Sequence, residues 1–178
     1  MTEQQNRVVM EAAQIQQTLE RLAREIVEET TDTQKLVLIG IHPRGALFAW
    51  RLQTIILQNF RLTVPVGTLD ITLHRHDWTR LQRRPLLLAT DLPFSIDDHE
   101  VILVDDVLYT GRTIKVALDA LDDYGLPRRV QVAVLVDRGH RELPICAQFT
   151  GIQLDTKLSD QVNVLLAENN GLDRVIVG

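Results

Sequence analysis

Two adjacent carboxylates follow a short apolar run in the segment VILVDDVLYTGRT, residues 101–113. Asp105 and Asp106 come directly after Val101–Val104, a run that is typical of a strand buried on both faces. Like charges repel each other at close range, so such a pair needs a ligand or a cation to offset the repulsion. The pair therefore predicts a binding site at the carboxyl end of a strand.

The turn that follows the carboxylates is suited to holding a phosphate. Residues 110–113 (TGRT) lead into apolar residues at helical spacing, so their backbone N–H groups would lie at a helix amino terminus, where an anion is favoured. Gly111 allows close approach of the backbone, and the two threonine hydroxyls add donors. Carboxylates that only accept hydrogen bonds suit the vicinal hydroxyls of a ribose, or a magnesium ion held directly or through water. Together they predict a socket for ribose 5-phosphate.

The alternative is an ordinary turn in which Asp106 caps the following helix. The attached phosphate cradle favours the binding site over this alternative. Other phosphate-binding signatures are absent from the sequence, since it contains neither G-x-x-x-x-G-K-[ST] nor G-x-G-x-x-G.

Strands and helices are expected to alternate along the chain, which predicts an α/β domain with a mainly parallel sheet. Apolar periodicity predicts helices over Glu11–Glu29, over Ala46–Asn59 with Trp50 in the core, and after Gly111. Short apolar runs predict strands at Lys35–Ile41, Val101–Val104 and Val130–Val136, and in QVNVLL and RVIV near the end. Alternating apolar residues predict a further strand at Thr63–Leu73 with one polar face. Right-handed crossovers would bring the loops HPRG (42–45), DDVLYTGRT (105–113) and DRGH (137–140) to one edge of the sheet.

The stretch His74–Glu100 has no period and exceeds the usual length of a connection, so we expect a mobile flap. No repeat, low-complexity tract or linker divides the chain, which predicts one domain over residues 1–178. Nineteen Lys and Arg against 24 Asp and Glu give a net charge of −5, so any nucleic-acid role must rest on a local patch. The single cysteine and the lack of a signal-peptide core or membrane span favour a cytoplasmic protein that has no membrane partner.

Three segments together resemble the PyrR proteins, which regulate pyrimidine operons and have uracil phosphoribosyltransferase activity. They are DITL (70–73), VILVDDVLYTGRT (101–113) and VLVDRGHRELPI (134–145), and the second is similar to the phosphoribosyl pyrophosphate (PRPP) motif of all type I phosphoribosyltransferases. The resemblance, from about Gln14 to Gly151, implies the type I phosphoribosyltransferase fold, an α/β fold with a mainly parallel twisted sheet flanked by helices, a small hood and a mobile flap.

The resemblance also implies an activity and partners. Uracil and PRPP would give UMP and pyrophosphate with Mg²⁺, and UMP would promote binding to the leader mRNA of a pyrimidine operon by a homodimer or homotetramer. Two alternatives stay open: a non-catalytic regulator that senses UMP or PRPP and binds RNA, and a phosphoribosyltransferase for another base such as hypoxanthine or orotate.

Site residues follow from the same resemblance. Implied catalytic residues are Arg44, Arg75, Asp105 and Asp106, with Arg44 and Gly45 in the pyrophosphate loop and Arg75 at the start of the flap. The implied PRPP and UMP contacts are Gly45, Asp105, Asp106, Val107, Leu108, Tyr109, Thr110, Gly111, Arg112 and Thr113. Asp137 and Arg138 would lie near the base, with Asp137 contacting the metal through water; RNA contacts would be Arg21, Arg24, Arg141 and Lys157.

The sequence departs from the family at four positions. Pro43 stands where threonine is common, and proline lacks an N–H donor for pyrophosphate. Gln16, Gln17 and Cys146 stand where arginines occur in relatives, and each lost phosphate contact would weaken RNA binding. We therefore rank catalysis above RNA binding, and we expect Cys146 to be an inert small side chain.

Overall fold

The computed structural model describes residues 7–72 and 89–178. In chain order the elements are β1 (Arg7–Glu11), α1 (Ala12–Glu29), a 3-10 turn η1 (Thr33–Lys35), β2 (Leu36–Ile41), α2 (Arg44–Phe60), β3 (Val66–Leu69), β4 (Glu100–Leu108), α3 (Arg112–Leu121), β5 (Arg129–Asp137), β6 (Phe149–Gln153), β7 (Val162–Leu165), α4 (Ala167–Asn170) and β8 (Arg174–Val177). No helix in these two ranges is long and apolar enough to cross a membrane.

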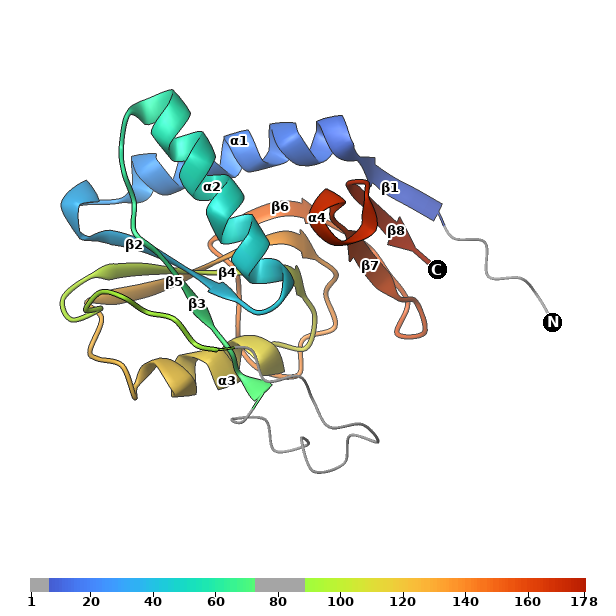
Figure 1. The fold of residues 1–178 in the computed structure, drawn as a ribbon. Coiled ribbons are helices and arrows are strands. Elements are labelled where there is room, and N and C mark those ends of the chain that lie inside the picture. Colours follow the sequence, from blue (N-terminus) through green and yellow to red (C-terminus); the bar gives the residue numbers. More distant parts are fainter. Residues whose placement is uncertain (1–6, 73–88) are drawn as a thin grey trace.

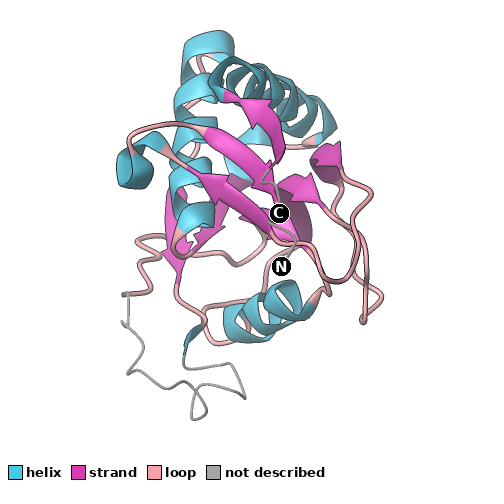
Figure 2. Ribbon diagram, turned by 90° about the vertical axis from the view of Figure 1, so that its right-hand side faces the viewer, coloured by secondary structure: helices cyan, strands magenta, loops and turns pink. Residues whose placement is uncertain are grey.

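A five-stranded sheet in the order β3-β2-β4-β5-β6 forms the centre of the molecule (Figure 1). Each neighbouring pair of strands in it is parallel, as the alternation of strands and helices predicts. Helices α1 and α2 cover one face and α3 covers the other, which Figure 2 shows from the side. Successive residues of β2 enter opposite cores: Leu36 and Leu38 pack with α1 and α2, and Val37 and Ile39 pack with α3.

A second, smaller sheet stands beside the carboxyl ends of the parallel strands (Figure 1). Its three strands are antiparallel in the order β1-β8-β7, and α4 lies between β7 and β8 in the sequence. We call β1, β7, α4 and β8 the hood. The resemblance implies such a hood, and the motifs QVNVLL and RVIV indicate two of its strands; β1 and the edge strand β6 were not predicted.

The strand expected over Thr63–Leu73 is shorter than predicted. β3 comprises Val66–Leu69, and the expected polar face is wrong because Gly67, Thr68 and Leu69 are all buried. The reason is that a later segment covers this edge: Thr68 exchanges backbone hydrogen bonds of 2.8 and 2.9 Å with Asp91.

The last part of the segment expected to be a mobile flap, His74–Glu100, contacts the rest of the protein. Residues 73–88, which include Leu73 and Arg75, lie outside the described part of the chain. After Asp91, however, the chain is packed: Ile96 is fully buried and the Asp97 carboxylate accepts the backbone N–H of Leu126 at 2.7 Å. The sequence did not predict these contacts, because the segment is polar and its partners are distant in the sequence.

Trp50 is not a core residue, contrary to the prediction. It is 55% exposed, whereas Phe48 and Leu52 are each 1% exposed. Side chains two positions apart on a helix point in directions that differ by about 200°. Because Phe48 and Leu52 face the sheet, Trp50 between them faces away from it. The rest of the predicted apolar stripe is confirmed, since Ala46, Ala49, Leu52 and Ile56 are all buried.

Two glycines let the start of α2 approach the sheet closely. A Cβ at Gly45 would lie 2.2 Å from the carbonyl oxygen of Val104, and one at Gly40 would lie 2.4 Å from the Cα of Ala46. These neighbours are backbone atoms, which cannot turn aside as a side-chain tip can. The distance between α2 and β4 therefore depends on the absence of side chains at both positions.

We expect Gly45→Ala to lower the free energy of unfolding by about 1–3 kcal/mol, the usual cost of overpacking a core. Thr54→Ala, at an exposed position of the same helix, serves as the control. Urea denaturation followed by circular dichroism measures both variants. Equal stability of Gly45→Ala and the wild type would contradict the close approach.

Candidate functional site

The loops that follow β2, β4 and β5 meet at one edge of the sheet, as the sequence predicts. Arg44 Nη1 lies 3.5 Å from Asp106 Oδ2, which connects the start of α2 to the end of β4. The backbone N–H of Arg138 donates to the carbonyl oxygen of Leu108 at 3.0 Å, which connects the ends of β5 and β4. All three loops therefore lie in one region.

The two carboxylates lie within β4, not after its end as predicted. The strand continues to Leu108 because its ladder with β5 extends to the Leu108–Asp137 pair. Asp105 is 8% exposed, and the Asp106 side chain is 16% exposed. The chain holds both in place, since Asp105 Oδ1 accepts the N–H of Asp106 and Asp106 Oδ1 accepts the N–H of Val107, each at 2.9 Å.

Asp105 is held in an environment that disfavours its charge. Burial raises the pKa of Asp105 well above its usual value, and the neighbouring charge of Asp106 raises it further. Arg44 acts in the opposite direction but is a smaller influence. A buried acid of this kind costs stability and is a frequent feature of functional sites.

The TGRT turn has the geometry of an anion site. α3 begins at Arg112, and its N-cap is Gly111 with φ of 90°, a conformation that favours glycine. Thr110 Oγ1 accepts the N–H of Arg112 at 3.3 Å, and Thr113 is partly exposed in the first turn. The first backbone N–H groups of a helix have no partner within the helix, so this terminus can bind a phosphate.

The segment after β5 supports this turn, a role that the sequence did not indicate. The carbonyl oxygen of Thr110 accepts the N–H groups of Glu142 and Leu143 at 2.9 and 3.1 Å. Arg112 Nε donates to Glu142 Oε2 at 2.7 Å. A Cβ on Gly111 would come within 3.1 Å of Ile145, so the segment also packs against the turn.

Arg141, predicted to contact RNA, has its donors engaged within the protein. It donates to the carbonyl oxygens of Tyr109 at 2.7 Å and Ile145 at 3.0 Å, and it pairs with the carboxylate of Asp137. The second Asp137 oxygen accepts the N–H of Gly139 at 2.9 Å. Asp137 and Arg141 also line a hollow of about 450 Å³ beside the end of β6.

Arg138 lies buried against Tyr109. It is 7% exposed, and its guanidinium carbon is 4.1 Å from the centroid of the Tyr109 ring. Its Nη2 donates to the carbonyl oxygen of Lys157 at 3.0 Å, and Thr156 Oγ1 donates to the Arg138 carbonyl oxygen at 3.1 Å. Its Nε has no hydrogen-bond partner, although buried donors usually have one.

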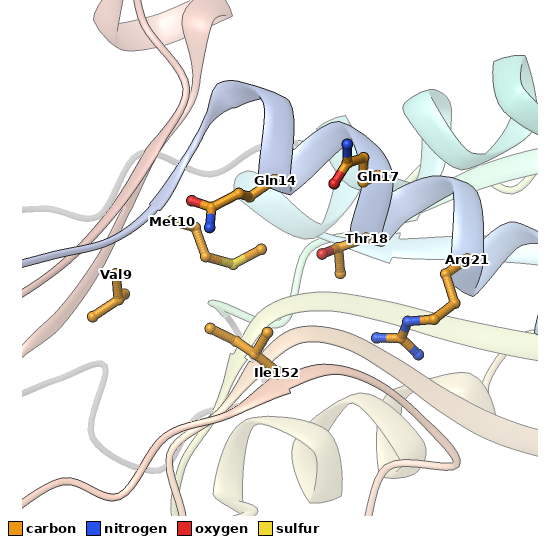
Figure 3. A pocket seen from close by; sticks show the side chains of 7 residues that line it. All are labelled: Val9, Met10, Gln14, Gln17, Thr18, Arg21 and Ile152. Carbon is orange, nitrogen blue, oxygen red and sulfur yellow. The ribbon is translucent and has the colours of Figure 1, made fainter.

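The remaining predicted RNA contacts lie on α1 and after β6. Arg21 donates to Glu25 and to the carbonyl oxygens of Thr150 and Gly151, whereas Arg24 and Lys157 are exposed. Figure 3 shows Arg21 and Gln17 at a hollow of about 350 Å³ between α1 and β6, lined also by Val9, Met10, Gln14, Thr18 and Ile152.

No group of three or more His, Cys, Asp or Glu side chains in the described ranges is arranged to hold a metal ion. The donor set nevertheless fits Mg²⁺ brought by a phosphate ligand, because this ion is usually bound by one or two carboxylates together with substrate phosphates and water. Asp106 fits this role, because its Oδ2 lies at the site, 3.5 Å from Arg44 Nη1. Asp137 fits less well, since both of its oxygens have partners.

Comparison with known proteins supports the interpretation of this region as a site for a phosphorylated sugar. The phosphoribosyl transferase domain family matches residues 10–166. "Bifunctional protein PyrR" of Syntrophobacter fumaroxidans is 62% identical over 177 residues, which cover 99% of this chain and 95% of the relative. The protein of the same name from Thermus thermophilus is 50% identical over 167 residues, covering 94% and 92% of the two chains.

Solved structures of lower identity share the fold. A hypoxanthine phosphoribosyltransferase from Staphylococcus aureus has a TM-score of 0.65 at 20% identity, covering 85% of this chain and 80% of that one. A hypoxanthine-guanine phosphoribosyltransferase from Bacillus anthracis has a TM-score of 0.66 at 18% identity and covers 85% of both chains. At these identities the likeness concerns the fold alone.

Asp105→Asn is expected to stabilise the protein at neutral pH. Because the pKa of Asp105 is raised in the folded state, that state binds more protons than the unfolded state between the ordinary and the raised pKa. Stability therefore falls as pH rises through this window. The amide carries no charge and keeps an oxygen for the N–H of Asp106, so we expect a gain of about 1–2 kcal/mol at pH 7.

Thermal unfolding from pH 4 to pH 8 measures this effect. The stability gain should shrink as the pH falls toward the ordinary pKa of an aspartate, because the folded wild type then gains a proton on Asp105 at progressively lower cost. A variant less stable than the wild type at pH 7 would show that the Asp105 charge is offset in the folded protein.

Proposed function

Because the chain belongs to the phosphoribosyltransferase family, and within it to the PyrR proteins, we propose that it converts uracil and PRPP to UMP and pyrophosphate. One observation carries this proposal: the paired carboxylates, the glycine turn at the start of α3 and Arg44 at the start of α2 meet at one edge of the sheet. Such a site accepts a phosphorylated sugar with a second anionic group.

Each part of PRPP has a matching part of the site. The N–H groups and hydroxyls of the TGRT turn would bind the 5-phosphate. Asp106 and the more deeply buried Asp105 would accept hydrogen bonds from the ribose hydroxyls. Arg44 and the backbone at Gly45 would meet the pyrophosphate, as the position of Arg44 beside Asp106 supports.

The base would lie near Arg138 and Tyr109. Arg138 is fixed by Tyr109 on one side and the Lys157 carbonyl on the other, and its buried Nε–H lacks a partner. A guanidinium donates hydrogen bonds only, so this region favours a ligand with carbonyl oxygens, such as uracil. Tyr109 also replaces the acid that purine-using relatives often carry at this position, which supports a pyrimidine.

The chemistry needs orientation and charge stabilisation more than covalent help. The bond from ribose C1 to pyrophosphate breaks as the bond to the base nitrogen forms, and C1 takes on positive character between the two events. The protein must hold the sugar, neutralise the leaving group and exclude water. Within the described part of the chain, Arg44 would supply positive charge to the leaving group. We propose that Arg75 adds to this charge.

Mg²⁺ is the proposed cofactor. It would arrive with PRPP, neutralise part of the pyrophosphate charge and be held by Asp106 directly or through water, with Asp137 a weaker candidate. Pro43 is exposed at the N-cap of α2 and has no N–H to offer the pyrophosphate. The catalytic rate is therefore expected to depend strongly on Arg44.

A second proposed function is UMP-dependent binding of a pyrimidine leader mRNA, which membership in the PyrR proteins implies. Arg24 and Lys157 are exposed and available for phosphate contacts. Arg21 and Arg141 have internal partners and would have to exchange them for RNA. The proposed RNA surface is therefore weaker than the sequence suggested. A cytoplasmic homodimer or homotetramer of single-domain chains completes the proposal.

Purified protein incubated with uracil, PRPP and Mg²⁺ should produce UMP and pyrophosphate, detected by chromatography. The Asp105→Asn, Asp106→Asn double variant should fold but lose PRPP binding in calorimetry, because the ribose acceptors lose their charge. Asp122→Asn with Asp123→Asn is a matched control, since this is another adjacent acid pair on an exposed turn. No product from the wild type, or PRPP affinity retained in the first double variant, would refute the proposal.

Pyrimidine leader RNA should bind more tightly when UMP is present. Arg24→Gln and Lys157→Gln should each lower the affinity and reduce the slope of log K against log salt by about 1, as expected for one lost phosphate contact. Filter binding across a salt series measures both effects. Equal affinity for a scrambled RNA of the same length would exclude specific recognition.

A further inference from the structure

One arginine on α2 holds two acids of the hood. Arg51 Nε and Nη2 donate to the two oxygens of Glu168 at 2.9 and 2.6 Å. Its Nη1 and Nη2 donate to the two oxygens of Asp173 at 2.7 and 2.8 Å. The Arg51 side chain is 19% exposed, so water competes little with these bonds.

The two acids belong to the turn that joins β7 to β8. Glu168 lies in α4, and Asp173 directly precedes β8. Asp173 Oδ1 also accepts the N–H of Ala167 at 2.7 Å, so the same carboxylate organises the turn and binds Arg51. Hydrogen bonding to Arg51 lowers the pKa of both acids, and both are therefore ionised at neutral pH.

The clamp formed by Arg51, Glu168 and Asp173 is a directional contact between α2 and the hood. Apolar side chains of the hood, such as Val164, Leu166 and Val175, also enter the main core. Hydrophobic contact is non-directional and tolerates sliding. Two bidentate ion pairs on one planar guanidinium fix both distance and angle.

Each end of the clamp leads to one side of the proposed site. α2 begins at Arg44, which lies 3.5 Å from Asp106 on the pyrophosphate side. On the other side, β7 follows the segment that contains Lys157, whose carbonyl oxygen holds Arg138. A movement of the hood relative to α2 would therefore change the spacing between the two sides.

We propose that Arg51 is a positioning residue that sets the distance between the pyrophosphate loop and the wall beside the base. This inference rests on the proposed function. Arg51 does not touch substrate; it acts through α4 and β7 on the Lys157 contact to Arg138. Its loss is expected to impair use of the base more than binding of PRPP, because the phosphate turn is supported independently by Glu142 and Leu143.

Arg51→Lys is the first test, since lysine keeps the charge but cannot form two bidentate pairs. We expect kcat/KM for uracil to fall by about tenfold or more, the scale of a small misplacement of reacting groups. The KM for PRPP should stay within about twofold of the wild type, since that part of the site has its own support. Arg129→Lys is a matched control, because Arg129 pairs with buried Glu100 at the opposite end of β5.

A charge-free variant separates positioning from stability. Arg51→Met alone leaves two acids without their partner and should lower the unfolding temperature. Adding Glu168→Gln and Asp173→Asn should restore much of the stability, but it should not restore kcat/KM for uracil, because the neutral groups cannot fix the angle. Recovery of both quantities together would overturn the proposal, as would equal losses toward uracil and PRPP or wild-type kinetics in Arg51→Lys.

Amide hydrogen exchange gives a readout that does not depend on turnover. In Arg51→Lys without ligand, exchange should be faster than in the wild type at residues 154–161 and at the start of α2, and unchanged in Arg129→Lys. Unchanged exchange at these segments overturns the proposal even if the wild type turns over no base. A wild type that turns over no base would refute the proposed function, which is a separate outcome.

Discussion

The burial of one acid beside a second acid in a central strand is the constraint on which the site depends. Asp105 is buried under the start of α2, and Asp106 is beside it at the surface of the site. In the free protein Arg44 offsets part of this charge from 3.5 Å away. A ligand that brings hydroxyl donors and a divalent cation would offset more, so the energy stored in the pair favours binding.

The close approach of backbones is what allows these charges to meet. Gly40 and Gly45 bring the start of α2 against β2 and β4, and Gly111 turns the chain from β4 into α3. The segment from Arg138 to Ile145 then packs over that turn and binds its carbonyl oxygens. The phosphate turn is thus held from its outer side, because its carbonyl oxygens bind groups of this segment.

The hood adds a second level of organisation. It is built from both ends of the described chain, and the ion pairs of Arg51 with Glu168 and Asp173 connect it to α2. Elsewhere, Arg141 and Arg21, which read as surface cations in the sequence, also have partners within the protein. Arginine has several donors in a planar group, so it serves equally well as a brace between backbone carbonyls and as a contact for RNA. Only its neighbours decide which role it takes.

The sequence by itself determined the parallel sheet, the helices that flank it and the meeting of three loops at one edge. These depend on local periodicity and on the handedness of crossovers, which hold for nearly every α/β chain. Only the tertiary structure decided the burial of Asp105, the exposure of Trp50, the covered edge of β3 and the strands β1 and β6. Each of these depends on contacts between residues far apart in the chain, such as Thr68 with Asp91 or the pairing of β1 with β8. No periodicity records such contacts, because burial depends on which surfaces meet and not on the order of residues along the chain.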